Sequence, residues 1–473
     1  MSTKPEFTAD QHDAAEFRAA DACIVAGPGS GKTTVLVERY RRLMEDRGFE
    51  PRQILAITFT EKAAANMKAR LGKIFEHDAV RRRELETGAW VSTIHGFCFR
   101  LLRENAIAAG LDPRFTVLSP REAESLQWEC LTAALNEFAA ARREDALALI
   151  EVLQVPSLAG DLKDVYDAIR SAGISLAEVR NKVNPAGAVT ADAPALIEEL
   201  RALVNAWPWK MTTNQAAEKD RLLEWCQTAS EATVTDFASF SQLWNGLSLN
   251  LTKIPRPVQD MMREFRDRVD AFRRAALDRH AARFRAMIFD VLDRFENEYR
   301  TRKAALSRVD FNDLERFTIA LLKNNPEVQK RVHEQFRQVM LDEFQDINGQ
   351  QSELIRLVRA PDVFFGVGDR NQSIYGFRHA KPEIFLKYRD EVSFQGGHSV
   401  SLRHNFRSRD AILRFVESAL ADQEGIERRE LIAGSKFSGK DEPSIEILRA
   451  IDVNAEAAGE REAAWIAHRV LEL

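Results

Sequence analysis

The chain has 473 residues, enough for two to four domains of ordinary size, and 45% of them are hydrophobic. Lys and Arg total 67 against 72 Asp and Glu, a net charge of −5, and this composition excludes a disordered chain, a fibre and a disulfide scaffold. The four cysteines form no CxxC pair, no run of 18 apolar residues occurs, and the first residues are too polar for a signal peptide. We therefore expect a soluble, cytoplasmic, multidomain protein with no membrane segment. The slightly acidic balance does not exclude nucleic acid, because a local groove can be basic.

The first 118 residues alternate short apolar runs with helical patterns. Residues 22–26 (ACIVA) and 54–59 (ILAITF) are predicted to be buried strands. Residues 32–43 and 61–75 are predicted to be helices, the second with Thr60 as its N-cap. Strands that alternate with helices predict a parallel sheet covered on both faces.

From about residue 119 to 306, Ala, Leu, Glu and Arg dominate. Apolar residues spaced three or four apart from Phe265 to Tyr299 predict one long amphipathic helix. Its arginines are predicted to form a solvated face, with a phosphate-facing strip as the alternative. His280 lies on the apolar stripe and is predicted to be packed in the core. Trp207 and Trp209 are predicted to pack in a core or loop, with a duplex-engaging role as the alternative.

The alternating pattern returns near residue 339. Residues 338–341 (QVML) and 363–367 (VFFGV) are predicted strands, and another apolar run lies at 399–402. Residues 444–451 are predicted to form a strand and 460–473 a helix. An α/β domain interrupted by a helical insertion is therefore expected. Because the sequence stops inside the apolar pattern of the last helix, we expect a truncated chain.

A glycine-rich segment stands between the first predicted strand and the first predicted helix. It comprises Gly27, Pro28, Gly29, Ser30, Gly31, Lys32, Thr33 and Thr34. Ala26 replaces the first glycine of the GxxxxGK[ST] pattern, but the strand–loop–helix context is the one that a phosphate loop requires. Backbone amides and the helix N-terminus can wrap phosphates, Lys32 can reach the β- and γ-phosphates, and the Thr33 hydroxyl can complete a Mg²⁺ shell.

An acidic pair follows the strand predicted at 338–341. Asp342 suits a magnesium ligand, and Glu343 suits the base for an attacking water. Acidic residues are common at strand exits, so the pair alone is a weak signal. Its association with a phosphate loop favours the functional interpretation.

Together these segments resemble a superfamily 1 DNA helicase of the UvrD/Rep type, and the chain is most similar to AddA/RecB-like helicase–nuclease subunits. The family's motifs occur in the family's order. They are the Q motif at 7–11 (FTADQ), Walker A at 27–34, motif Ia at 58–64 (TFTEKAA), motif Ib at 92–97 (STIHGF), Walker B at 342–346 (DEFQD), motif III at 368–378 (GDRNQSIYGFR) and motif IV at 403–408 (RHNFRS). Residues 310–314 (DFNDL) favour the AddA-like group. The resemblance spans residues 7 to about 410.

The resemblance implies a RecA-like P-loop motor domain with a parallel sheet, built from residues 1–118 and 301–398. Residues 119–300 would form an all-helical insertion, and 399–473 the start of a second RecA-like domain. It also implies an ATP- and Mg²⁺-dependent helicase that moves 3′→5′ on single-stranded or duplex-junction DNA in repair and recombination. A nuclease-bearing partner subunit is one option. Because two further motifs of the family do not occur before Leu473, we expect this chain to bind ATP with impaired hydrolysis and little unwinding.

The resemblance also implies roles for single residues. Gln11 would pair with the adenine edge, and Phe406 would pack on the adenine face. Gln372 would sense the γ-phosphate, and Arg407 would act as an arginine finger. Aromatic stacking platforms for DNA would be Phe59, Tyr375 and Phe377, with Thr60, Thr93, His95 and Arg378 as further DNA contacts. Burial at a strand end is the alternative for each aromatic residue.

Three functions remain open from the sequence. The first is an ATP-driven DNA helicase and translocase. The second is a non-unwinding, nucleotide-dependent single-stranded-DNA-binding subunit of a larger helicase–nuclease complex. The third is a P-loop switch unrelated to DNA, against which the aromatic residues of motifs Ia, Ib and III argue. Stimulation of ATP hydrolysis by DNA separates the first two.

Overall fold

The computed structural model describes residues 7–17, 21–153, 158–183, 192–234, 237–421, 423–435, 437, 445 and 455–472. The chain divides into two compact units. Unit 1 comprises Met1–Ser119, Ser171–Gly173 and Ser307–Leu473, and unit 2 comprises Pro120–Arg170 and Ile174–Leu306. None of the helices in the described ranges is long and apolar enough to cross a membrane.

Unit 1 contains a six-stranded sheet in the order β3-β2-β6-β7-β1-β8. All of its strand pairs are parallel, which confirms the predicted α/β fold. The strands are β1 (Ala22–Ala26), β2 (Ile54–Thr58), β3 (Trp90–Thr93), β6 (Gln338–Leu341), β7 (Phe364–Gly368) and β8 (His398–Leu402). The four strands that the sequence predicts most clearly, β1, β2, β6 and β7, are therefore neighbours in the centre of the sheet.

The position of β8 corrects the predicted domain boundary. We expected residues 399–473 to begin a second RecA-like domain, but β8 pairs with β1 from Ala22 beside His398 to Ala26 beside Leu402. Val400 and Leu402 are buried in the core on one face of the same sheet. The apolar run alone does not reveal which sheet the strand joins, because its pairing partner is far away in the sequence.

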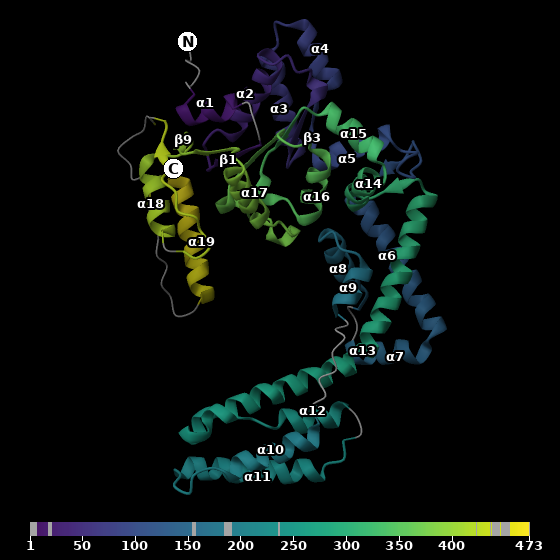
Figure 1. Ribbon diagram of the computed structural model, residues 1–473, viewed down its shortest axis with the longest axis vertical. Coiled ribbons are helices and arrows are strands. Elements are labelled where there is room, and N and C mark those ends of the chain that lie inside the picture. Colours follow the sequence, from purple (N-terminus) through teal and green to yellow (C-terminus); the bar gives the residue numbers. More distant parts are fainter. Residues whose placement is uncertain are drawn as a thin grey trace. The chain divides into compact units, whose positions relative to one another are not determined.

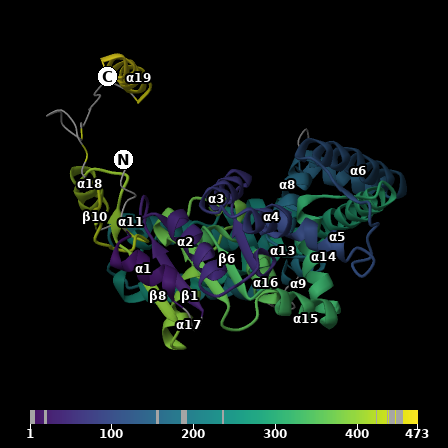
Figure 2. The same ribbon diagram turned by 90° about the horizontal axis from the view of Figure 1, so that it is seen from above.

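Helices cover both faces of the sheet because successive strand residues point to opposite sides. Ile24, Ala56 and Met340 face α1 (Ala9–Glu16), α2 (Lys32–Glu45) and α3 (Glu61–Ile74). Cys23 and Leu55 belong to the opposite core, formed with α5 (Ile94–Glu104), α14 (Phe311–Asn324), α15 (Pro326–Gln335), α16 (Gly349–Val358) and α17 (Pro382–Phe394). Figures 1 and 2 show α1 and α2 on one side of the sheet and α17 on the other.

Shorter elements complete unit 1. These are α4 (Ala79–Gly88), the pair β4 (Thr116–Val117) and β5 (Arg308–Val309), the 3₁₀ turns η1 (Pro51–Gln53), η4 (Phe344–Asp346), η5 (Arg370–Gln372) and η6 (Gly376–Arg378), the pair β9 (His404–Asn405) and β10 (Ile432–Ala433), α18 (Asp410–Leu420) and α19 (Ala455–Glu472). The helix predicted at 460–473 thus begins earlier. The strand predicted at 444–451 lies outside the described residues except for Ile445.

Unit 2 is helical throughout its described residues. It contains α6 (Pro120–Ala141), α7 (Arg143–Leu153), α8 (Leu158–Ser171), α9 (Leu176–Val183), α10 (Ala193–Asn205), α11 (Thr213–Glu231), α12 (Phe237–Asn245), the turns η2 (Leu251–Lys253) and η3 (Arg256–Val258), and α13 (Gln259–Ala305). The predicted long helix is confirmed, although α13 extends beyond it at both ends and crosses the boundary predicted at residue 300.

Helix α13 contributes to two separate cores of unit 2. Its first part packs Phe265 and Phe272 with α10, α11 and α12, and its last part packs Val291 and Phe295 with α6 and α8. Figure 1 shows α13 as one continuous helix from the α10–α12 bundle to α6. Each core uses only one segment of the helix, which explains why a single apolar stripe runs along its length.

Two predictions for unit 2 are wrong. His280 is exposed rather than packed in the core, because it lies in the stretch of α13 between the two cores, where its ring stacks on Phe237 with centroids 4.1 Å apart. Trp209 is 86% exposed because it lies in the turn after α10, with the Lys210 ammonium 5.2 Å from its ring centroid. Trp207 is buried, as predicted.

Candidate nucleotide and DNA site

The loop between β1 and α2 has the backbone that a phosphate cradle requires. Gly29 and Gly31 have φ values of +69° and +85°, a left-handed conformation that favours glycine. Gly31 is the N-cap of α2, so the amides of the first helical turn follow the loop directly. A Cβ on Gly31 would lie 2.8 Å from the Gln11 amide nitrogen. Glycine is therefore needed there for both the conformation and the close approach.

Three predicted residues from three neighbouring strands meet at this loop. The Lys32 Nζ lies 2.6 Å from Glu343 Oε2 and 3.1 Å from Gln372 Oε1. Lys32 follows β1, Glu343 follows β6, and Gln372 follows β7, and these strands are adjacent in the order β6-β7-β1. The carboxyl ends of parallel strands meet at one edge of a sheet, where ligands bind in open α/β folds.

The acidic pair after β6 is held in an unusual electrostatic environment. Asp342 is buried, and this burial, reinforced by the charge of Glu343, raises the pKa of its carboxyl to about 6. Burial and Glu343 likewise raise the pKa of Asp346 to about 6. Glu343 has φ +53°, which is strained for a residue with a side chain and costs roughly 1–3 kcal/mol. Such strain at a predicted catalytic residue is consistent with a functional constraint.

Gln345 links these carboxylates to the next strand. Its Nε2 donates to Glu343 Oε2 at 2.9 Å and to Asp346 Oδ2 at 3.0 Å, while its Oε1 accepts from the Asp369 amide at 2.9 Å. Gln345 was not among the predicted site residues. Its place in the DEFQD segment, directly after a buried strand, was the signal that could have revealed it.

Gln11 lies against the phosphate loop. Its Nε2 donates to the Ser30 carbonyl at 2.9 Å, and its Oε1 accepts from the Thr8 amide at 3.0 Å, which completes a capping box on α1. The side chain therefore ties the start of the chain to the loop. Its contact with adenine stays a prediction.

The segment after β8 is fastened to the same loop. The buried Asn405 donates through Nδ2 to the Pro28 carbonyl at 2.7 Å, and the Phe406 amide donates to the Gly29 carbonyl at 2.9 Å. Asn405 Oδ1 accepts from the amides of Arg407 and Ser408, both at 2.8 Å. Phe406 is half-buried and the Arg407 side chain is exposed. Asn405 is a positioning residue that the sequence did not single out.

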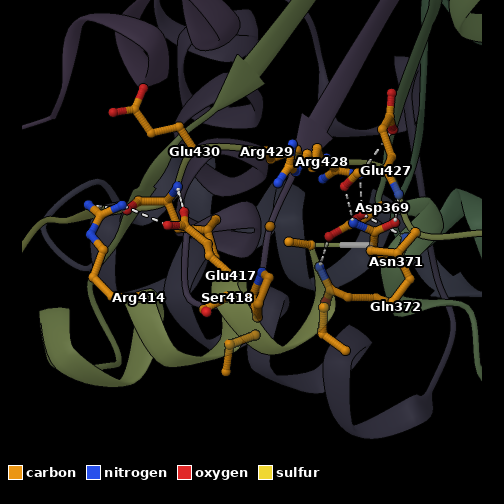
Figure 3. A pocket seen from close by; sticks show the side chains of 17 residues that line it. Asp369, Asn371, Gln372, Arg414, Glu417, Ser418, Glu427, Arg428, Arg429 and Glu430 are labelled. Atoms are coloured by element: carbon orange, nitrogen blue, oxygen red, sulfur yellow. Dashed lines mark hydrogen bonds and ion pairs between the residues drawn. The ribbon is translucent and has the colours of Figure 1, made fainter. Parts of the chain in front are cut away.

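An open pocket of about 880 Å³ adjoins the loop. Gly27 and Pro28 contribute to it, together with Asp369, Gln372 and residues of α18 and 426–431. Figure 3 shows Asp369, Asn371 and Gln372 beside Glu427, with Arg414 and Glu417 on the opposite side. The pocket therefore brings residues after β7 together with residues from a much later part of the chain.

The three predicted stacking residues also come together. The rings of Phe59 and Tyr375 have centroids 4.7 Å apart, and those of Tyr375 and Phe377 are 5.8 Å apart. Phe377 is 77% exposed, so burial at a strand end is wrong for this residue. The Arg378 guanidinium lies 5.5 Å from the Tyr375 ring. The result is a row of aromatic faces with an adjacent cation.

The remaining candidate DNA residues follow β2 and β3 and have defined partners. Thr60 caps α3, and Thr93 caps α5 while its hydroxyl also donates to Glu61 Oε1 at 2.7 Å. His95 Nε2 lies 3.1 Å from an oxygen of the buried Glu315. These contacts position the three side chains, and their DNA roles stay predictions.

In the described part of the chain, no group of three or more His, Cys, Asp or Glu side chains could hold a metal ion. An ion at this site would therefore need oxygens from outside the protein. A phosphate-bound Mg²⁺ obtains most of its ligands from phosphates and water.

Comparison with known proteins agrees with the geometry. Residues 7–393 match the family described as the UvrD/REP helicase N-terminal domain. Proteins named as one of the subunits of an ATP-dependent helicase/nuclease are similar to this chain: that of Moorella thermoacetica is 30% identical, with 87% of this chain and 34% of the relative covered. That of Alkaliphilus oremlandii is 26% identical over 97% of this chain and 43% of the relative, and that of Listeria welshimeri is 27% identical over 93% and 42%. The chain thus spans less than half the length of these relatives.

Proposed function

Since the chain belongs to the UvrD/REP helicase family, we propose that unit 1 binds ATP on the Gly27–Thr34 loop and couples its hydrolysis to movement on single-stranded DNA. The observation that carries this proposal is the meeting of Lys32, Glu343 and Gln372 at the loop. A phosphate-loop lysine, an acid and a γ-phosphate-facing amide are the groups that ATP hydrolysis requires.

The contact between Lys32 and Glu343 suggests how hydrolysis begins. Without nucleotide, the Lys32 ammonium pairs with the Glu343 carboxylate at 2.6 Å. The β- and γ-phosphates would attract Lys32 and release Glu343 to orient a water molecule. The water oxygen attacks the γ-phosphorus, the bond to the bridging oxygen of ADP breaks, and the Glu343 carboxylate accepts the water proton. Arg407, exposed next to the loop-bound Asn405, would reach the transferred phosphoryl group.

The residues present fit a Mg²⁺ ion. The Asp342 carboxylate and the Thr33 hydroxyl are the oxygen donors that this ion prefers, and the raised pKa of Asp342 would fall beside a cation. When bound, Mg²⁺ would neutralise charge on the β- and γ-phosphates. Phe406 would pack on the adenine, next to Gln11.

For DNA, the supporting feature is the aromatic row of Phe59, Tyr375 and Phe377. Exposed aromatic faces bind successive bases without sequence preference, and Arg378 can contact the backbone. Thr60, Thr93 and His95 follow the neighbouring strands β2 and β3 and would extend this surface. Gln372 and Tyr375 lie in the same short loop, so nucleotide and DNA would act on one segment.

The finer activity follows from the resemblance of the motifs. We propose 3′→5′ movement on single-stranded or junction DNA in repair and recombination, with impaired unwinding by the 473-residue chain. The alternative is a nucleotide-dependent DNA-binding subunit of a larger complex. It is favoured by the relatives' name, which describes one component of a helicase/nuclease and so implies another, and by the share of their length that this chain spans.

ATP hydrolysis by the chain with and without single-stranded DNA tests the proposal. Stimulation by DNA supports a motor, whereas tight, unstimulated nucleotide binding supports the binding subunit. Lys32→Ala should weaken nucleotide affinity by about 10- to 100-fold, the loss of one charged hydrogen bond. Lys387→Ala is the control, because this lysine is exposed on α17. Equal nucleotide affinity of both variants would contradict the phosphate-loop assignment.

A further inference from the structure

Residues 427–429 contact the loop that carries Gln372, although they lie far from it in the sequence. Asn371 donates through Nδ2 to the Glu427 carbonyl at 2.8 Å, and the Glu427 amide donates to Asn371 Oδ1 at 3.0 Å. The Glu427 carboxylate also pairs with Arg389 of α17 at 2.7 Å. This reciprocal pair of hydrogen bonds fixes the 427–429 backbone on the loop.

Arg429 reaches from this segment to Asp369. Its Nη2 lies 2.5 Å from Asp369 Oδ1 and 3.3 Å from Glu427 Oε2. The Asp369 side chain is only 2% exposed, and a buried carboxylate is costly unless a cation or several donors compensate it. Arg429 supplies that cation, and Figure 3 shows it at the pocket beside Asp369 and Glu427.

Asp369 in turn determines how the Gln372 amide is oriented. Its Oδ2 accepts from Gln372 Nε2 at 2.7 Å, and the same nitrogen donates to the Ala26 carbonyl at 3.1 Å. An amide nitrogen has two N–H donors, and both are used here. The carbonyl oxygen must therefore point the other way, where it accepts from Lys32 Nζ at 3.1 Å.

We propose that Arg429 is a positioning residue that acts through Asp369 to orient Gln372 toward the γ-phosphate. The proposal rests on the proposed function, because it takes Gln372 as the group that distinguishes ATP from ADP. Without Arg429, the buried Asp369 carboxylate loses its cation and no longer holds the amide in one orientation. Recognition of the γ-phosphate then weakens, whereas binding of the two phosphates that ADP shares with ATP does not.

Isothermal titration calorimetry on the full chain with Mg²⁺ tests this without requiring hydrolysis. The probes are ADP and the non-hydrolysable adenylyl imidodiphosphate, and the measured quantity is the ratio of their Kd values. Arg429→Gln should reduce the preference for the triphosphate by about 3- to 10-fold at unchanged ADP affinity, as expected for one misplaced hydrogen bond. Arg429→Lys keeps the charge and should recover most of the preference. Arg428→Gln, at the exposed neighbouring position, should leave it unchanged.

A double variant separates positioning from general destabilisation. Arg429→Gln combined with Gln372→Ala should be no worse than Gln372→Ala alone, because one acts through the other. An additive loss, an equal loss of ADP affinity, or a wild-type ratio in Arg429→Gln would each overturn the inference while leaving the proposed function standing. If the wild-type chain bound neither nucleotide in a Lys32-dependent way, the proposed function would fail, and the inference with it.

Discussion

The two units differ in where their charged side chains lie. Among the described residues, unit 1 buries Arg39, Asp310, Asp313, Glu315, Asp342, Asp346 and Asp369, whereas unit 2 buries Glu218 and Lys303. In unit 2 most arginines of α13 pair at the surface, as Arg294 does with Asp290 at 3.0 Å, and such pairs contribute only about 0–1 kcal/mol.

Buried charges are costly, so a fold retains them where they are compensated or used. Asp342, Asp346 and Asp369 all follow β6 or β7, at the edge of the sheet where the phosphate loop lies. The comparison teaches that burial of charge, rather than its density along the sequence, marks the chemical part of this molecule. Unit 2 is rich in charge but keeps most of it in solvent.

The largest effect should come from removing the proposed base in unit 1. Glu343→Gln keeps the shape and the hydrogen bonds of the side chain but cannot accept a proton. We expect ATP turnover to fall by about 10²- to 10⁴-fold with nucleotide affinity retained. Steady-state hydrolysis and equilibrium binding measure the two. Glu353→Gln on α16 is the control, because its carboxylate pairs with Lys323; turnover equal to that of the control would refute the assignment.

Unit 2 should respond in stability rather than chemistry. Phe295 is fully buried, with its ring centroid 4.6 Å from that of Tyr166, and Phe295→Ala should lower the free energy of unfolding by about 3–5 kcal/mol. Urea unfolding followed by circular dichroism measures this. Leu277→Ala, at a half-exposed position of the same helix, should change it by less than about 0.5 kcal/mol. A loss of nucleotide affinity at low denaturant would break the separation between the units.

The buried carboxyls of unit 1 predict a pH dependence of stability. The pKa of Asp342 is raised from 3.8 to about 6, so the folded state binds the proton more tightly than the unfolded state. The free energy of unfolding should therefore fall as pH rises from about 4 to 6, by up to about 3 kcal/mol, and stay level above that range. Denaturation across this range measures it. Asp342→Asn should flatten the curve, and an unchanged slope would contradict the assignment.

The aromatic row should give the smallest effect. Phe377→Ala should weaken binding of a fluorescent oligothymidine by about 1 kcal/mol, the low end for one stacked base, because its ring is largely exposed. Fluorescence anisotropy at fixed salt measures the affinity. Phe394 is 92% exposed on α17 and provides the control, Phe394→Ala. Equal affinity of the two variants would place the DNA elsewhere.

Much of the sheet could be predicted because its strands are continuous apolar runs. The phosphate loop, the acidic pair and Thr60 as an N-cap are also local patterns, and the structure places them where the sequence indicated. The partner of β8 could not be predicted, because strand pairing depends on residues hundreds of positions apart. The same reason applies to Arg429: nothing in the local sequence shows that it faces Asp369.

The errors in unit 2 have a different origin. An apolar stripe shows which face of a helix can be buried, but not where along the helix a partner lies. His280 is on the stripe of α13 and is exposed because the stripe serves two cores with a gap between them. Trp209 shows that a large aromatic side chain in a turn need not reach a core.

The continuity of α13 has a mechanical consequence. At about 1.5 Å per residue, its 47 residues span roughly 70 Å as one rod. Each end is embedded in its own core, so the rod acts as a lever arm within unit 2. A tilt of about 5° at one end would displace the other by about 6 Å at that length. A small rearrangement where α13 packs on α6 is thereby amplified at the α10–α12 bundle.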